Sequence, residues 1–527
     1  MNDMKIPSAR QKSRAKPRSA RSETILLCTP WQWLVAATGG LIVSGFLWPW
    51  YDHISYWIGL TVFLMVVTVI HMIFTSRFFV PLPHIAIQIS GLQYVLAAWL
   101  TTYYPSDNPV FNIGERLPEY LTFTGKAIIA VFLGWTVTLW GIKQTPMRTM
   151  PASPALLAEL DVLFWFGLFV AVMGGFVHLG SLDFVVVLCA NLRYVGALGR
   201  MMVGGPGWKW RIWLTLALEV LWATRGGMFH SLLLWSACAF ALYIFKTKPK
   251  RVVVLGLVCL GVLLLPALEQ AKFKIRERVW TEQQGQRYWL ISIENLRNTV
   301  DWFGDLGDGV IKTATLSWDA DFLGDICARY NQGWIINRVM ETVPASEPYA
   351  RGKTLIADAE AAALPRVLAP NKMEAGGKEN MARYANYTPN ESTSMNLGYA
   401  GEFYANFGYF GGIIGCFCYA LVLGLLYRWV FNRAAQNPLW WAFIPFVGLI
   451  GLKAEDDVGA VLNWIVKAGI LTVAIYYFFP AIRAALSRSA AEHKPARARK
   501  SRFGQPQPDL AQTNPAIRDL EFKEIPK

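Results

Sequence analysis

Charged residues are scarce in this chain. Asp, Glu, Lys and Arg make up 16% of its 527 residues, whereas 54% are hydrophobic and 14% are aromatic. Soluble globular domains carry about 25% charged residues. The composition therefore excludes an ordinary soluble multidomain protein and indicates a protein that crosses a membrane several times.

Cysteine is also rare, and its placement excludes a disulfide framework. Of the seven cysteines, only Cys327 falls in the long polar segment 269–397, and a single thiol cannot form an intrachain disulfide. No Cys or His spacing is typical of zinc. The aspartates of DWFGDLGDG (residues 301–309) do not follow the pattern of a calcium loop. We expect no bound metal ion.

Motifs for nucleotide binding and hydrolysis are missing as well. The sequence has no Gly-rich loop followed by Lys and Ser or Thr, no HExxH and no GxSxG. We therefore expect no cofactor and no energy coupling through ATP bound by this chain.

The sequence is instead rich in long apolar runs. A helix needs about 20 residues to cross roughly 30 Å of hydrocarbon, and about twelve runs come near that length. They lie at residues 30–49, 55–75, 84–103, 122–141, 159–178, 182–199, 211–224, 228–245, 252–268, 407–428, 437–453 and 460–480. The weakest is 182–199, because it contains Asp183, Asn191 and Arg193. The expected fold is an all-α polytopic membrane protein with about twelve transmembrane helices.

Lys and Arg predict how these spans are oriented, because short cytoplasmic loops hold the excess of both. Both ends of the chain are basic, so both termini are expected in the cytoplasm. With twelve spans, the short inner loops hold 12 Lys and Arg, and the short outer loops hold three, Arg116, Arg225 and Lys453. The net charge of +14 thus lies in tails and inner loops, where it sets topology and contacts anionic lipids rather than nucleic acid.

The spans divide the chain into five parts. Residues 1–24 are a basic cytoplasmic tail, 25–268 hold spans one to nine, 269–399 form a large external loop, 400–480 hold the last three spans, and 481–527 are a second basic tail. Helical periodicity at the start of the loop predicts one or two amphipathic helices on the outer membrane surface. A further helix is expected at 331–344, ended by Pro344, and irregular chain at 365–396.

The first group of candidate site residues surrounds WATRGGMFHS (222–231), between the seventh and eighth spans. Arg225 and the two glycines after it could face an anionic group, the alternative being a plain turn with a snorkelling arginine. His230 could reach the same space. Glu219, in the middle of the seventh span, is a candidate by its depth in the membrane, unless it is satisfied by Arg193 of the sixth span.

The second group lies in the external loop, in ARYNQGWIINRVMETVPASEPYARGKTL (328–355). Its polar candidates are Arg329, Asn331, Arg338, Arg351 and Lys353. They are expected just outside the membrane, at the level of the phosphate of a lipid-linked substrate. The alternative is a solvated charged loop.

The third group lies in GYAGEFYANFGYFGGIIG (398–415), which leads into the tenth span. Glu402 stands at the lip of the span, with Asn406 one helical turn deeper. We expect Glu402 and Asn406 to orient a substrate group or an arginine, or Glu402 to hold the loop by pairing with a loop arginine. Two small-xxx-small pairs predict close approach of another helix, Gly408 with Gly412 and Gly411 with Gly415.

Together, these features resemble the Wzy-type O-antigen and exopolysaccharide repeat-unit polymerases. The resemblance rests on the many spans and on four short motifs in matching places. These are Thr224-Arg225-Gly226 at an outer face, Arg329-Tyr330-Asn331 and Arg351-Gly352-Lys353 in one large late loop, and GEFYANFGYFGG at 401–412.

The resemblance implies a GT-C-like glycosyltransferase in the bacterial inner membrane, with its large loop in the periplasm. It would move the growing glycan from undecaprenyl diphosphate onto the terminal sugar of an incoming undecaprenyl-diphosphate-linked repeat, without nucleotide sugar or metal. Arg225, Arg329 and Arg351 match the positions where the family binds diphosphate, and Glu402 or His230 would accept the proton of the acceptor hydroxyl. A polysaccharide chain-length regulator could bind as a partner.

Two other functions stay open. An O-antigen ligase would transfer the glycan to a different acceptor, and His230 beside Arg225 would then matter more. A flippase or other transporter could use Glu219, Arg193 and Asp183 to line a pathway. The single large outer loop and the lack of internal repeats argue against a transporter.

Overall fold

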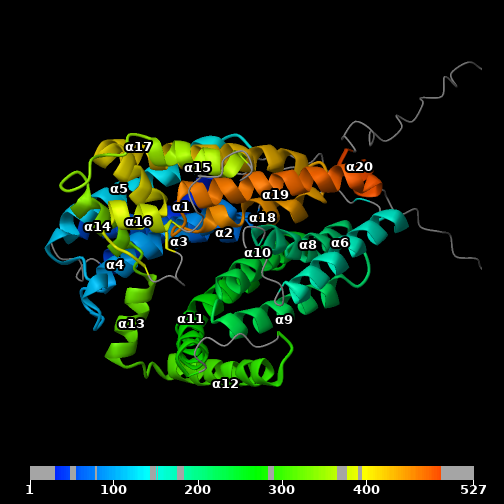
Figure 1. Cartoon of the computed structure of the whole chain (residues 1–527), viewed down its shortest axis with the longest axis horizontal. Coiled ribbons are helices and arrows are strands. Elements are labelled where there is room, and N and C mark those ends of the chain that lie inside the picture. Colours follow the sequence, from blue (N-terminus) through cyan, green and yellow to red (C-terminus); the bar gives the residue numbers. More distant parts are fainter. Residues whose placement is uncertain are drawn as a thin grey trace, which may run out of the picture. The chain divides into compact units, whose positions relative to one another are not determined.

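The computed structural model describes residues 30–47, 55–76, 80–142, 150, 152–174, 183–282, 290–364, 377–389 and 395–487. Within these ranges the chain forms helices joined by turns and loops, without a β-strand (Figure 1). The all-α class expected from the sequence is confirmed.

The α-helices are α1 (Pro30–Leu47), α2 (Ser55–Thr75), α3 (Leu82–Gly91), α4 (Ala97–Leu100), α5 (Leu117–Leu139), α6 (Pro154–Met173), α7 (Asp183–Ala190), α8 (Leu192–Val203), α9 (Trp208–Gly226), α10 (His230–Thr247), α11 (Arg251–Arg276), α12 (Ile293–Thr315), α13 (Ala320–Tyr330), α14 (Gly333–Thr342), α15 (Lys353–Ala363), α16 (Lys378–Tyr384), α17 (Gly398–Ala434), α18 (Trp440–Gly448), α19 (Val458–Phe478) and α20 (Pro480–Ser487). Short π or 3-10 segments are η2 (Leu92–Leu96), η3 (Pro109–Phe111), η4 (Gly114–Arg116), η6 (Glu277–Glu282) and η7 (Ile450–Leu452).

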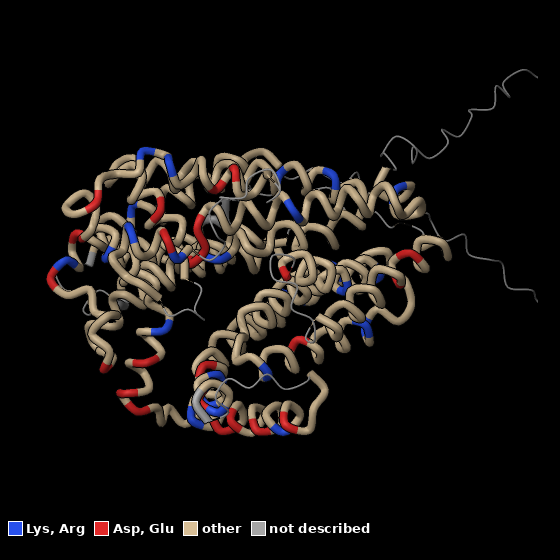
Figure 2. The backbone as a smooth tube through the Cα atoms, in the orientation of Figure 1, with Lys and Arg blue, Asp and Glu red and all other residues tan. Residues whose placement is uncertain are grey.

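Eight helical segments in the described part of the chain are long and apolar enough to cross a membrane. They are Tyr56–Thr75, Pro109–Leu139, Pro154–Met173, Asp183–Val203, His230–Thr247, Arg251–Trp280, Gly398–Ala434 and Val458–Phe478. Charged residues are sparse along the apolar part of each segment (Figure 2). The chain is therefore a helical membrane protein with several spans.

The other four predicted runs are helical but do not meet this criterion. Run 30–49 forms α1, and run 84–103 forms α3 to α4 with a π-helical stretch between them. Run 211–224 forms α9, which contains charged residues, and run 437–453 forms α18, which has only 9 residues and an internal proline. Twelve crossings thus remain a prediction.

Helix α17 packs along α5 through two glycines that bring the backbones together. A Cβ atom added to Gly134 of α5 would lie 2.6 Å from the carbonyl oxygen of Phe417, and one added to Gly424 of α17 would overlap the side chain of Thr138. The predicted close approach of two helices is present, but largely through glycines other than those expected.

The four glycines that the sequence singled out have different surroundings. Gly412 faces Phe123 of α5, whereas Gly411 and Gly415 face phenylalanines of α17 itself. Gly408 lies at a kink in α17, with φ 69° and ψ −161°. This backbone conformation favours glycine because it has no Cβ atom.

The segment 269–399, which the sequence predicts to be an external loop, is more helical than expected. The predicted helix at 331–344 is α14, which ends at Thr342, before Pro344. The prediction of irregular chain at 365–396 is wrong for α16, while 365–376 and 390–394 lie outside the described residues. The loop also begins later than expected, because α11 continues beyond residue 268 to Arg276.

Candidate functional site

A short acidic segment, Lys453–Asp457, joins η7 to α19 and lies between two groups of polar residues. The ammonium of Lys453 lies 3.3 Å from a carboxylate oxygen of Glu455 and 3.3 Å from one of Asp456. The backbone is fixed as well, since the Tyr94 hydroxyl donates to the carbonyl of Ala454. Asp457 caps α19 by accepting a hydrogen bond from the N–H of Ala460 at 2.8 Å.

The first group contains Glu269, Lys272 and Tyr330. Glu269 is buried, with 3% of its surface exposed, and Lys272 donates to both of its oxygens at 2.9 Å. The Tyr330 hydroxyl donates to the same carboxylate at 3.0 Å. These hydrogen bonds join the end of α13 to the part of α11 that follows its apolar run. Arg329, next to Tyr330 in the sequence, lies beside the Glu269 carboxylate.

Arg329 is the cation of this group that has no bonded partner. Its side chain is exposed, and it makes no hydrogen bond or ion pair with any residue that the structure describes. Surrounding protein lowers the pKa of Arg329 by desolvation, while the carboxylates of Glu269 and Glu455 oppose that effect. The guanidinium stays charged and keeps its donors available for an anionic group.

His230 lies near the same acidic segment. It begins α10, its side chain is exposed, and the charges of Lys453, Glu455 and Lys272 act on its imidazole. Arg329 and His230, 99 residues apart in the sequence, therefore both lie within electrostatic reach of Glu455. The structure places these two predicted site residues near the same carboxylate.

Glu402 and Asn406 belong to the second group, which holds α15 against α17 and α19. Glu402 is fully buried, and its two oxygens accept hydrogen bonds from the Thr354 hydroxyl at 2.7 Å and the Val458 N–H at 2.8 Å. Asn406 donates to Thr354 at 2.7 Å. Glu402 pairs with no arginine among the described residues. It joins α15 to α17 and α19 through a hydroxyl and a backbone amide.

Asp358 of α15 completes this group. Asp358 is buried, and Glu402, Asp457 and the backbone of Gly459 are the groups that act on its carboxyl group. One of its carboxylate oxygens has no hydrogen-bond partner among the described residues. Burial raises the pKa of Asp358 to about 6. Burial also raises the pKa of Asp457 to about 7, with the charge of Glu402 as the next cause.

Arg351 and Lys353 lie on a turn that Asn406 fixes through its backbone. The N–H of Arg351 donates to the carbonyl of Asn406 at 3.0 Å, and the N–H of Gly352 donates to the side-chain oxygen of Asn406 at 2.9 Å. Both basic side chains are exposed. Neither makes a hydrogen bond or ion pair with a described residue, so this turn presents two available cations.

Arg225 and Glu219 lie apart from these two groups, on α9. Arg225 lies over the ring of Trp222, 5.1 Å from its centroid, at the end of α9. Glu219 forms an ion pair with Arg193 of α8, and both are buried. The alternative expected from the sequence, in which Arg193 satisfies Glu219, is confirmed.

Asn331 and Arg338 differ in their surroundings although they are close in sequence. Asn331 is fully buried and donates to the carbonyl of Phe111 at 2.9 Å, so it holds the α13–α14 turn in place. Arg338 is half-buried on α14, whereas Arg329 is on α13. The two arginines therefore belong to different helices.

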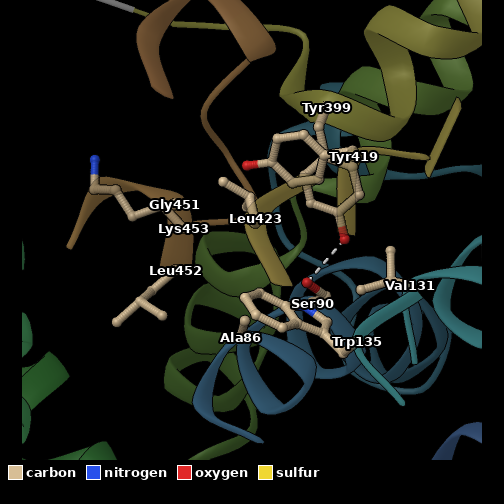
Figure 3. Close-up of a pocket in the computed structure, with 10 residues that line it drawn as sticks. All are labelled: Ala86, Ser90, Val131, Trp135, Tyr399, Tyr419, Leu423, Gly451, Leu452 and Lys453. Carbon is tan, nitrogen blue, oxygen red and sulfur yellow. Dashed lines mark hydrogen bonds between the residues drawn. The ribbon is translucent and has the colours of Figure 1, made fainter. Parts of the chain in front are cut away.

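A narrow crevice adjoins the start of the acidic segment at Lys453 (Figure 3). Tyr399 and Tyr419 stack in it with ring centroids 4.9 Å apart, and Tyr399 donates to the Ser90 hydroxyl at 2.9 Å. The ammonium of Lys453 points away from these rings (Figure 3). The crevice has room for about one water molecule, so it is too small for a substrate.

Sequence reasoning missed the acidic segment, Glu269, Lys272 and Asp358. A signal for the first was present, because Glu455, Asp456 and Asp457 are consecutive acids between two apolar runs. Nothing in the sequence around Asp358 indicates a role in the site, because it comes close to Glu402 only in the folded chain.

Comparisons of the chain with protein-family models, with curated proteins and with solved structures found no match. The function is therefore argued from the site.

Proposed function

We propose that this protein is a membrane glycosyltransferase that polymerises lipid-linked oligosaccharide repeats at the outer face of the bacterial inner membrane. The observation that carries the proposal is Arg329, a charged and exposed guanidinium without a bonded partner among the described residues, set beside Glu269 and Glu455. The motif resemblance to Wzy-type polymerases supports the same reaction.

The reaction needs a cation where Arg329 lies. The acceptor hydroxyl oxygen attacks the anomeric carbon of the growing glycan, and the bond from that carbon to the undecaprenyl diphosphate breaks. The electron pair goes to the diphosphate, whose negative charge grows in the transition state. A guanidinium held ready for that charge stabilises the transition state more than the bound substrate.

A base must also accept the proton of the acceptor hydroxyl. Glu455 is suited to this, because its side chain is 36% exposed and shares the surroundings of Arg329 and His230. His230 is the other group in reach. Glu402 fits a positioning role better, since it is fully buried with both oxygens accepting hydrogen bonds.

Two lipid diphosphates must be bound in each cycle, one on the donor and one on the acceptor. Arg351 and Lys353 form a second exposed cationic turn, which would serve the diphosphate of the incoming repeat. Both side chains can contact phosphate oxygens, Arg351 through two donors at once.

Replacing Arg329 tests the proposal. A strain lacking the gene is complemented with wild type, Arg329→Ala, Arg329→Lys or Arg297→Ala. Arg297 is a matched control because it is also exposed and makes no bond to a described residue. We expect Arg329→Ala to lower polymer formation about 100-fold, with single lipid-linked repeats left on the outer face. Arg329→Lys should retain part of the activity, and Arg297→Ala all of it.

Immunoblots of the membrane fraction must show equal amounts of each variant. If Arg329→Ala forms a normal amount of polymer, Arg329 is not required for the reaction and the proposal is wrong. Repeats retained on the inner face of the deletion strain would instead identify a flippase, and polymer that is made but not attached to its final acceptor would identify a ligase.

A further inference from the structure

Helix α12 has an unusual protein-facing side. The residues it buries recur every three or four positions, as one side of a helix does, and they are Asn295, Asn298, Trp302, Asp305 and Gly309. Several of these are polar and form hydrogen bonds with α9, α11 and η6. Asn295 donates to the carbonyl of Leu221 at 3.1 Å, and Asp305 accepts from Lys274 and Arg278 at 2.8 Å each.

The opposite side of α12 is apolar and exposed. Its residues also recur every three or four positions: Ile293, Leu296, Val300, Phe303, Gly307, Val310, Ile311 and Ala314. Ile293, Val300 and Ile311 are 82%, 69% and 63% exposed. At about 100° per residue they form one stripe about 100° wide. We refer to these eight residues as the outer stripe.

Charged residues occupy a third side, between the buried side and the outer stripe. They are Glu294, Arg297, Asp301, Asp308 and Lys312. A helix in water buries its apolar residues and exposes its polar ones. Here the polar side faces protein, the charged side is partly exposed, and the outer stripe faces away from the rest of the chain. Such a division suits a helix that borders protein, water and hydrocarbon at once.

We propose that α12 lies in the outer surface of the bilayer, with its outer stripe in contact with phospholipid acyl chains. The position of α12 along α11 supports this. A Cβ atom added to Gly309 would lie 2.7 Å from the Cα of Ala267, where the apolar run of α11 ends. Toward its start, α11 exposes Leu255, Leu260 and Val262, in a segment long and apolar enough to cross a membrane. Helix α12 thus packs against a helix that exposes apolar side chains suited to lipid.

Two tryptophans near α12 agree with this depth. Trp280, in η6, is 47% exposed, and its N–H donates to the carbonyl of Gly226 at 3.1 Å. Trp318 follows α12, and the ammonium of Lys312 lies 5.6 Å from its ring centroid. Trp side chains are enriched at membrane–water interfaces, where the ring is apolar and its N–H reaches polar groups.

Site-specific photocrosslinking in native membranes tests the assignment. Benzoylphenylalanine is placed at position 303 of the outer stripe, at 308 of the charged side, and at 410 of α17. Phe410 is 77% exposed on a membrane-spanning helix and serves as the lipid-facing control. After irradiation, the full-length protein is purified and its adducts are identified by mass spectrometry. We expect phospholipid adducts at 303 and 410, and none at 308.

The proposal is overturned if 410 yields phospholipid adducts and 303 does not. It is equally overturned if 303 crosslinks to a second copy of the chain or to another protein. Positions 300 and 311 are used in parallel, so that a folding defect from one replacement does not decide the result.

Discussion

At the scale of single residues, the burial of Asp358 beside Glu402 favours a proton on this pair of carboxyl groups. Asp358 is 3% exposed, and one of its carboxylate oxygens has no hydrogen-bond partner among the described residues. Burial of a carboxyl group without such a partner disfavours its ionised form. Because Asp457 lies near both, the docking of α15 onto the spans depends on protons held in a buried acidic group.

This arrangement predicts that stability falls as pH rises. Burial raises the pKa of Asp358 to about 6 and that of Asp457 to about 7, so the folded state holds protons that the unfolded state has already lost. The stabilisation is complete below about pH 4, where both states are protonated, and is lost as pH rises through 6 to 7. We expect the melting temperature of the purified protein to fall between pH 5 and pH 8.

Asp358→Asn isolates this effect. The amide stays neutral and can donate to Glu402 at any pH, so at pH 8 the variant should gain up to about 3 kcal/mol and its melting temperature should change less with pH. Glu360→Gln, an exposed change on the same helix, should follow wild type. A pH profile for Asp358→Asn that parallels wild type would show that a proton on Asp358 is not the cause.

The sequence was informative about some of these residues and silent about others. Arg193 and Glu219 could be matched in advance, because opposite charges inside apolar runs have few partners to choose from. The partners of Glu402 could not be foreseen. They are a hydroxyl from α15 and a backbone amide from α19, and no pattern in the sequence connects three segments of such different kinds.

At the scale of elements, the kink at Gly408 determines how the start of α17 meets the loop. Glu402 and Asn406 lie before the kink and bind α15 and its preceding turn, whereas the part after it packs along α5. A Cβ atom at Gly408 would lie 3.0 Å from the ring of Tyr349 and would occupy a left-handed φ of 69°. Both effects oppose any side chain at this position.

Gly408→Ala should therefore destabilise the protein by about 1–3 kcal/mol and reduce polymer formation, since the residues before the kink position the loop. Fluorescence-detected gel filtration after heating measures the stability. Gly469→Ala is the matched control, because Gly469 is within α19 and a Cβ atom there would meet nothing within 4 Å. If Gly408→Ala and Gly469→Ala show the same stability and form the same amount of polymer, the kink is not required for either.

Most helices could be predicted from the apolar runs, because length and hydropathy alone determine them. The kink could not, since GYFGG is compatible with both a straight and a bent helix. Helix α12 was expected to be amphipathic, but periodicity alone does not say that its polar side faces protein. The ion pairs of Lys274 and Arg278 with Asp305 show that the polar side of α12 faces protein. These pairs form only in the folded chain.

At the scale of the whole membrane-embedded unit, contacts between helix ends agree with alternating crossings. Arg428 donates to the carbonyl of Thr138 at 2.8 Å, and Glu159 accepts from the N–H of Ala481 at 2.9 Å. Both contacts join ends that the positive-inside rule assigns to the cytoplasm. At ends assigned to the outside, Arg276 donates to the carbonyl of Gly227 at 2.8 Å.

This agreement predicts a topology that reporter fusions can measure. Alkaline phosphatase is active only outside the cytoplasm and green fluorescent protein folds well only within it. Phosphatase fused after Ser346, in the large loop, should therefore be active, and phosphatase fused after Lys250 should be inactive. Fluorescent protein fused after the basic tail should be bright, because Lys and Arg keep that tail in the cytoplasm. Active phosphatase both after Ser346 and at the carboxyl terminus would require an even number of crossings between these two points. Three are predicted there, so this result would contradict the cytoplasmic position of the basic tail.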